Sequence, residues 1–184
     1  CFRNCPKLNK ITIIQFKNKR VELFDDNFLI FKKDPKNKFC DTLLWTKLSI
    51  VTAVIPSFIK TINDYAFYNR TLLTTVSIPS SVTSIGDYSF SYCSSLLQIL
   101  IPSSVTEIGM GVFEHCSNLR QISFQTPSSV TAIRKYFALG CYSLNNITIP
   151  SSVTLIDNFA FNGCTGLKKV SFQGNKDYID IKYH

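Results

Sequence analysis

Four cysteines recur at near-regular intervals in the second half of the chain and are its first candidates for chemistry: Cys93, Cys116, Cys141 and Cys164. Cysteines in one column of a stacked repeat could form disulfides, because neighbouring strands lie about 4.8 Å apart and this spacing falls within the Cα range of a disulfide. They could equally be small buried side chains that make weak S–H hydrogen bonds. The odd total of seven cysteines and their repeat spacing favour the second interpretation, a ladder of structural thiols.

Catalysis or metal binding at these cysteines would require partners that the sequence does not supply. A nucleophilic cysteine needs a nearby base and a lowered thiol pKa, and the histidines are His115 and His184. The repeat directs Cys116 inward and its neighbour His115 outward, onto an exposed turn. The chain has no C-x-x-C pair, and Cys1 and Cys5 have no partner at zinc-like spacing. We therefore expect no catalytic residue, no cofactor and no metal ligand, and we interpret the chain as non-enzymatic.

The cysteines are positioned by a 23-residue repeat, which we call a rung. A rung begins with an apolar residue and proline, as in Ile78-Pro79, continues with Ser-Ser-Val-Thr, and has isoleucine three residues after the valine. The cysteine follows eight residues after that isoleucine, and the order x-x-Leu-x-x-Ile/Val-x-Ile/Phe closes the rung. The rung between Ile101-Pro102 and Thr126-Pro127 is longer by two residues.

This period predicts a solenoid of stacked short strands. In Leu-x-x-Ile-x-Ile the last two isoleucines alternate with the strand period, so both face inward and the residue between them faces outward. Proline then ends the strand because it has no N–H to donate. Residues 86–90 and their equivalents predict a helical or 3₁₀ turn that delivers one aromatic side chain inward. One rung cannot bury its apolar face alone, whereas stacked rungs can.

These motifs resemble the BspA-type (bacterial surface protein A-like) leucine-rich repeat family, whose pattern is I-P-x-x-V-x-x-I-G-x-x-A-F-x-x-C-x-x-L-x-x-I-x-I. The match covers residues 55–172 and residues 1–13. Three departures occur: Arg70 replaces cysteine, Ala138 stands where phenylalanine is expected with Phe137 beside it, and Arg134-Lys135 replace the Gly-Asp type. The resemblance implies a right-handed leucine-rich repeat solenoid.

The chain divides into four predicted segments. Residues 1–13 are a partial repeat, 14–54 a non-repeat insertion, 55–172 a five-strand repeat array, and 173–184 a C-terminal extension that is a cap or the start of a further insertion. Within the insertion, residues 27–31 and 39–44 predict a β-hairpin around a turn at Asp34-Pro35. No apolar run is long enough to cross a bilayer, so we expect no transmembrane segment in these residues.

The positive charge is concentrated near the start of the chain. Residues 1–60 contribute +7 of the formal net charge of +8. Attraction to nucleic acid could come only from this region. A solvated hairpin whose lysines discourage strand-to-strand association explains the charge more simply, and we expect no nucleic-acid partner.

The outward residues of successive strands form columns, which we predict to be a protein-binding face. They are mostly small hydroxyl and amide side chains, and Leu97 and Leu100 add an apolar anchor. A generic strand surface enriched by β-propensity remains the alternative. The predicted face comprises Thr75, Ser77, Leu97, Gln98, Leu100, Arg120, Gln121, Ser123, Asn145, Asn146, Thr148, Lys168, Lys169 and Ser171.

Two sequons are potential glycosylation sites if the chain is secreted: Asn69-Arg70-Thr71 and Asn146-Ile147-Thr148. Asn69 is the better acceptor because it is expected on a turn, whereas Asn146 lies beside a strand.

The resemblance implies a function in protein binding, because BspA-type repeats occur in surface proteins of mucosal bacteria and protist parasites that are linked to adhesion. We therefore predict a cell-surface or secreted module that binds a host extracellular-matrix or cell-surface protein. The alternatives are a cytoplasmic protein-interaction scaffold that uses the same face, and an enzyme or nucleic-acid binder that uses the basic first third.

Overall fold

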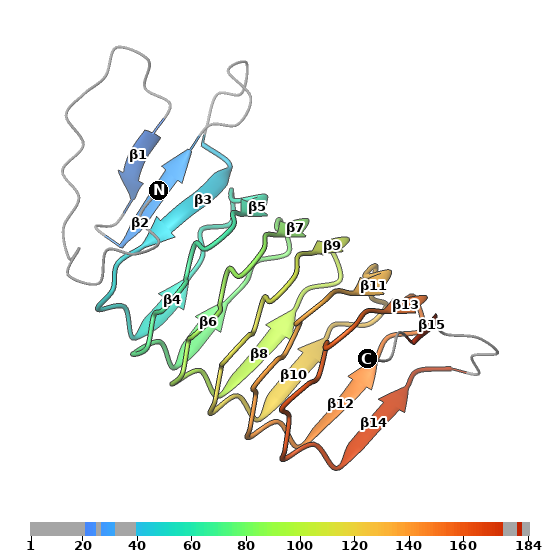
Figure 1. The fold of residues 1–184 in the computed structure, drawn as a ribbon. Coiled ribbons are helices and arrows are strands. Elements are labelled where there is room, and N and C mark those ends of the chain that lie inside the picture. Colours follow the sequence, from blue (N-terminus) through green and yellow to red (C-terminus); the bar gives the residue numbers. More distant parts are fainter. Residues whose placement is uncertain (1–20, 25–26, 32–39, 175–179, 182–184) are drawn as a thin grey trace.

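The repeat folds into a solenoid with two rows of short parallel strands (Figure 1). The structure, a computed structural model, describes residues 21–24, 27–31, 40–174 and 180–181. The first row consists of β4 (Thr52–Val54), β6 (Thr75–Ser77), β8 (Gln98–Ile101), β10 (Gln121–Phe124), β12 (Asn146–Ile149) and β14 (Lys169–Phe172). The second, which we call the return row, consists of β3 (Thr42–Thr46), β5 (Thr61–Ile62), β7 (Ser84–Ile85), β9 (Glu107–Ile108), β11 (Ala132–Ile133), β13 (Leu155–Ile156) and β15 (Asp180–Ile181).

The pairing register follows the repeat period. In the first row, Gln98 pairs with Gln121, Gln121 with Asn146, and Asn146 with Lys169. Each step advances by one rung, including the step across the longer rung, so equivalent residues stand in columns. This confirms the predicted solenoid with a spacing of about 23 residues.

The return row is interrupted at the longer rung. Strands β3, β5, β7 and β9 pair in succession, and β11, β13 and β15 form a separate sheet. The two additional residues lie between β10 and β11, in the rung whose return strand does not pair with β9. In the first row, β10 and β12 still pair in parallel across the longer rung, over two residues. The break in that row falls elsewhere, between the β4–β6 pair and the sheet of β8, β10, β12 and β14.

A ladder of phenylalanine rings fills the centre of the stack. Phe67 and Phe90 are stacked with ring centroids 4.7 Å apart, and Phe90 stacks on Phe113 at 5.9 Å. Phe137 continues the ladder edge-on at 5.3 Å from Phe113. Phe137 is fully buried, and its side chain supplies the ring that Ala138 lacks. The prediction that each turn delivers an aromatic side chain inward is therefore confirmed.

The helical or 3₁₀ form of these turns is not found, since the part of the chain that the structure describes contains no helix. The reason is visible in the first turn, where Tyr65 and Asn69 both have φ of 59°. Tyr65 N–H donates to Asp87 O in the next rung at 2.9 Å, whereas Ala66 N–H bonds locally to Asn63 O at 3.2 Å. Alternate N–H groups therefore bond between rungs, which a helix would not allow.

The segment before the array forms antiparallel strands, as the sequence predicts. Strand β1 (Val21–Phe24) pairs with β2 (Phe28–Phe31), and β2 pairs antiparallel with β3. The predicted turn at residues 32–38 and the partial repeat at 1–13 lie outside the described residues. Strands β3 and β4 already pair in parallel with β5 and β6, so parallel stacking extends upstream of residue 55, where the sequence analysis placed the start of the array.

The C-terminal segment contributes one further strand to the return row. Strand β15 pairs in parallel with β13 and continues its register. Residues 175–179 and 182–184 lie outside the described part, so the role of residues 173–184 as a cap or insertion remains a prediction. Among the described residues, no helix has the length and apolar character needed to span a membrane.

Candidate protein-interaction face

The outer surface of the first row, which we call the strand face, follows from strand alternation. In β8, Ile99 and Ile101 are buried, whereas the side chain of Leu100 between them is 54% exposed. Leu97, just before the strand, is 44% exposed. Since side chains alternate between the two sides of a strand, one side of the inner rungs packs on the core and the other meets solvent. In β14, at the end of the row, the inward residues Val170 and Phe172 are each 40% exposed.

The structure brings all fourteen predicted residues to this face. Twelve are exposed, and Ser123 and Ser171 are partly buried. They form three columns along the solenoid. The columns are Leu97, Arg120, Asn145 and Lys168; Thr75, Gln98, Gln121, Asn146 and Lys169; and Ser77, Leu100, Ser123, Thr148 and Ser171.

The face has one further rung, β4, that lies outside the fourteen predicted residues. Strand β4 pairs with β6 so that Thr52 lies beside Thr75 and Val54 beside Ser77. The side chain of Val54 is 73% exposed, and Val51 is also exposed. The 23-residue offset from Thr75 to Thr52 could have indicated this rung. The pattern is weakened there because Ala53 stands at the inward position where the other rungs have isoleucine or valine.

Most polar groups of the face are available to a ligand. Among the described residues of the face, the side-chain hydrogen bonds are those of Gln121 to Ser123 Oγ, at 3.0 Å, and of Thr74 to Val51 O, at 3.0 Å. The remaining hydroxyl and amide groups point outward between exposed aliphatic side chains. Such a surface offers a protein both hydrogen bonds and apolar contact area.

The cysteine column lies inside the stack, away from this face. Each thiol donates to a backbone carbonyl of the preceding rung: Cys93 to Phe67, Cys116 to Phe90, Cys141 to Phe113 and Cys164 to Ala138, at 3.0–3.1 Å. All four are free thiols. Burial raises the pKa of Cys93 to about 12 and that of Cys164 to about 11, and also raises the pKa of Cys116 and Cys141. Such thiols are inert structural groups.

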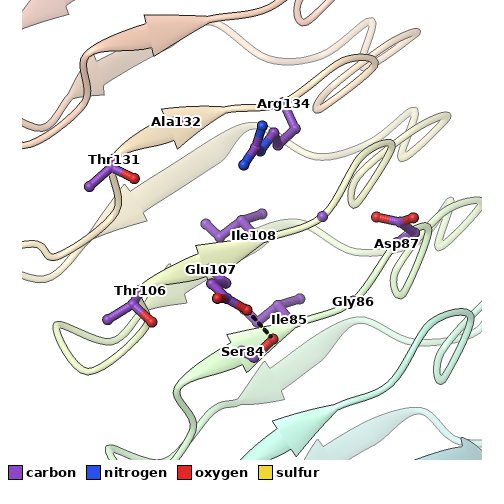
Figure 2. Close-up of a pocket in the computed structure, with 11 residues that line it drawn as sticks. Ser84, Ile85, Gly86, Asp87, Thr106, Glu107, Ile108, Thr131, Ala132 and Arg134 are labelled. Atoms are coloured by element: carbon purple, nitrogen blue, oxygen red, sulfur yellow. Dashed lines mark hydrogen bonds between the residues drawn. The ribbon is translucent and has the colours of Figure 1, made fainter.

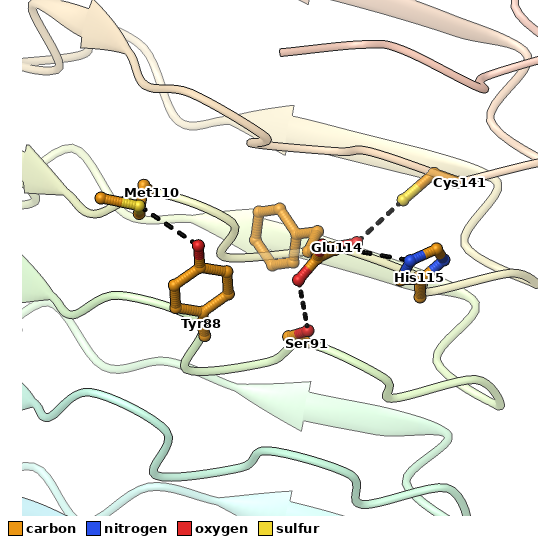
Figure 3. A network of polar contacts seen from close by, with 7 residues as sticks. Tyr88, Ser91, Met110, Glu114, His115 and Cys141 are labelled. Carbon is orange, nitrogen blue, oxygen red and sulfur yellow. Dashed lines mark hydrogen bonds and ion pairs between the residues drawn. The ribbon is translucent and has the colours of Figure 1, made fainter. Parts of the chain in front are cut away.

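As the sequence predicts, Cys116 is buried whereas the His115 side chain is partly exposed. Figure 3 shows His115 beside Glu114. Its ring packs on Tyr92 with centroids 4.7 Å apart, and its Nε2 lies 4.0 Å from Glu114 Oε1. Glu114 also accepts a hydrogen bond from Ser91 Oγ at 3.3 Å. The nearby polar groups thus form pairs between neighbouring rungs, with His115 on the outer side of the turn and the Cys116 thiol in the core.

A pocket of about 460 Å³ lies on the return row, where β9 and β11 are unpaired (Figure 2). Three rungs line it, and its charged side chains are those of Asp87, Glu107 and Arg134. Glu107 accepts a hydrogen bond from Ser84 Oγ at 3.5 Å. The lining contains neither cysteine nor histidine. Within the described residues, no three His, Cys, Asp or Glu side chains gather as a metal site would require.

The two sequon asparagines are both exposed. Asn69 lies on a turn with φ of 59°, as expected, and Asn146 lies within β12, which is paired on both sides. Glycosylation at either position remains a prediction.

The fold and its columns define a leucine-rich repeat solenoid. The family described as "BspA type Leucine rich repeat region (6 copies)" matches the sequence over residues 41–168, which is most of the chain. The chain therefore belongs to this family. The match begins close to β3, in agreement with the early start of parallel stacking. No curated protein matches the chain.

Solved structures of bacterial leucine-rich repeat proteins share the fold. A Eubacterium ventriosum protein aligns with a TM-score of 0.75 and 26% identity over 85% of this chain and 41% of its own. The Treponema pallidum leucine-rich repeat protein aligns with a TM-score of 0.68 and 23% identity, over 92% of this chain and 86% of its own. The pneumococcal vaccine antigen PcpA aligns with a TM-score of 0.55 and 25% identity, over 72% of this chain and 30% of its own. The chain therefore spans less than half of the Eubacterium protein's length.

Proposed function

We propose that this chain is a non-enzymatic protein-binding module whose ligand lies on the strand face. The observation that carries the proposal is the arrangement of exposed aliphatic side chains and available amide and hydroxyl groups in columns on one side of the solenoid. Stacked repeats commonly use such extended surfaces to bind proteins. Family membership supports the same class of function.

Two aspartates placed on the face test this proposal. Leu97→Asp with Leu100→Asp puts charges where apolar contact is expected, and we expect at least a tenfold loss of affinity for a protein ligand because charged groups are unfavourable in an interface core. The matched control is Met110→Asp with Thr131→Asp, two exposed residues outside the face. Equal affinity of both double variants would contradict the proposal.

Adhesion at a cell surface is the biological role that we propose for this binding. The support is the structural similarity of the chain to the pneumococcal protein PcpA, which is described as a vaccine antigen. The partner would then be a host extracellular-matrix or cell-surface protein. A cytoplasmic interaction scaffold using the same face is the alternative.

Antibody labelling of the full-length parent protein on intact source cells separates these two roles. Labelling without permeabilisation supports adhesion and directs the ligand screen to matrix and cell-surface proteins. Labelling only after permeabilisation contradicts adhesion and directs the screen to intracellular proteins.

A further inference from the structure

We propose that the strand face selects a protein segment that carries an apolar anchor followed by a cluster of carboxylates. This inference rests on the proposed function and adds the chemistry of the partner. It comes from the distribution of charge and of aliphatic side chains over the four paired strands β8, β10, β12 and β14.

The charges of the strand face are all positive. Arg120, Lys168 and Lys169 are exposed there, and the structure shows none of them in an ion pair with any described residue. No aspartate or glutamate belongs to the columns of the face. The carboxylates whose side chains the structure describes all belong to the return row and the turns: Asp41, Asp64, Asp87, Glu107, Glu114 and Asp157.

This segregation has a consequence for partner choice. Residues 61–184 together carry a formal charge close to zero, but among the described residues the cations of the face have no ion-pair partner and its columns contain no carboxylate. Complementary potentials guide association and exclude partners of like charge. An acidic segment is therefore favoured on this face, and a basic one is disfavoured.

The leucine pair and the lysine pair occupy opposite ends of the four-stranded sheet, and Arg120 lies one rung from Leu97. Leu97 and Leu100 belong to the β8 rung, and Lys168 and Lys169 to the β14 rung. Leu97 and Lys168 share one column, and three strand-to-strand steps separate them. At about 4.8 Å per step the two groups lie about 14 Å apart, the length of about four residues of an extended chain.

Apart from Arg120, the face residues between these ends are amides and hydroxyls that suit a polypeptide backbone. Gln98, Asn145 and Asn146 have no hydrogen-bonded side-chain partner among the described residues. Amide side chains both donate and accept, so they can pair with the N–H and C=O groups of a segment laid along the column. A polyanionic sugar would satisfy the lysines and leave the leucine pair exposed, which is why a protein segment fits better.

A random dodecapeptide display library, selected on the full chain, tests the inference. Counter-selection uses the Leu97→Asp, Leu100→Asp double variant, so that retained peptides depend on the strand face. We expect retained peptides to carry an aliphatic or aromatic residue with aspartate or glutamate about four residues away. Heparin oligosaccharide is the polyanion control, and circular dichroism melting confirms that each variant is folded.

Charge exchange then tests the lysines directly. Lys168→Glu with Lys169→Glu should weaken a retained peptide about tenfold at low salt. A peptide in which lysines replace the carboxylates should recover affinity for this variant and bind the native chain poorly.

The outcomes separate the inference from the proposed function. Peptides that depend on Leu97 and Leu100 but show no acidic enrichment, and that are insensitive to the lysine reversal, leave the proposed function standing and overturn the inference. A selection in which counter-selection removes all binding peptides, because they bind the double variant equally well, contradicts both. Heparin binding that depends on the lysines and not on the leucines overturns the inference in favour of a polysaccharide ligand.

Discussion

The guanidinium carbon of Arg70 lies 5.1 Å from the ring centroid of Trp45 in the preceding rung. Arg70 is 4% exposed although it occupies the column that holds cysteine elsewhere. Its Nε donates to Thr46 O at 2.8 Å, and its Nη1 donates to Tyr68 O. Thr46 Oγ1 in turn donates to Ala66 O at 3.0 Å. These contacts tie β3, which carries the antiparallel strands, to the repeat array.

Replacing Arg70 by leucine should therefore destabilise the fold. The variant leaves buried carbonyl groups without their charged donor, and we expect a loss of about 2 kcal/mol in the free energy of unfolding. Arg70→Lys should recover only part of this, because an ammonium lacks the planar fork of donors. Urea titration measures both variants. Arg120→Leu, at an exposed arginine, is the control, and a loss at Arg120 as large as that at Arg70 would refute the assignment.

Alkaline pH should destabilise the protein through its cysteine column. Burial raises the folded-state pKa of Cys93 to about 12, above the value of 9.0 expected when it is unfolded. The folded state therefore holds the proton more tightly. The stabilisation is complete below pH 9 and is lost as the pH rises through the folded-state pKa, at a limiting slope of about 1.4 kcal/mol per pH unit for each thiol.

Chemical denaturation between pH 8 and pH 11 measures this slope. Cys93→Ala removes one titrating thiol, so the free energy of unfolding should fall less steeply with pH in this variant. This expectation does not depend on how much the variant is destabilised at pH 8. The buried guanidinium of Arg70 interacts electrostatically with Cys93, so Cys164→Ala, three rungs beyond Cys93, serves as the comparison away from this charge. An unchanged slope in both alanine variants would show that the column does not govern alkaline stability.

A side chain at Gly111 should destabilise the fold. Its φ is +60°, and a Cβ there would lie 2.3 Å from Cε1 of Tyr88, so alanine would displace the ring. Gly163 is the matched position. Its φ is +71°, but a Cβ added there would lie no closer than 3.4 Å to any atom beyond the adjacent residues. We expect Gly163→Ala to cost about 1 kcal/mol from backbone strain alone, and Gly111→Ala to cost more.

The difference between the two alanine variants isolates the contact with Tyr88. In a Tyr88→Ala background, Gly111→Ala should lower the stability of the fold only as much as Gly163→Ala does in the native chain. Thermal melting of the four variants completes the comparison, and a Gly111→Ala penalty that persists in the Tyr88→Ala background would refute the steric explanation.

The parts of the structure that follow from hydrophobic spacing could be predicted from the sequence. The period places Leu97 and Leu100 on one side and Ile99 and Ile101 on the other, and the register keeps equivalent residues in columns. The turns could not be predicted in this way. Their conformation depends on positive φ at Tyr65 and Tyr88, which bulky side chains seldom adopt and which inter-rung hydrogen bonds of the stack maintain.

Two further features depended on context beyond one rung. Val51 and Val54 join the strand face because β4 pairs with β6, although Ala53 weakens the local pattern. The separation of β9 from β11 depends on how the two additional residues of the longer rung are accommodated. A repeat motif reports residues that face the core, and it carries less information about surface positions and loop lengths.

Hydroxyl-radical footprinting of the chain, alone and bound to a protein ligand from the matrix and cell-surface screen, tests the central claim most directly. The reaction rate of a side chain follows its exposure, and comparably exposed reporters lie on both sides of the solenoid. We predict that Val54, Leu97 and Leu100 become several-fold less reactive in the complex, while Met110 and Tyr92 on the turns do not change. Protection of Met110 and Tyr92 with unchanged reactivity of the two leucines would contradict the assignment of the strand face as the binding surface.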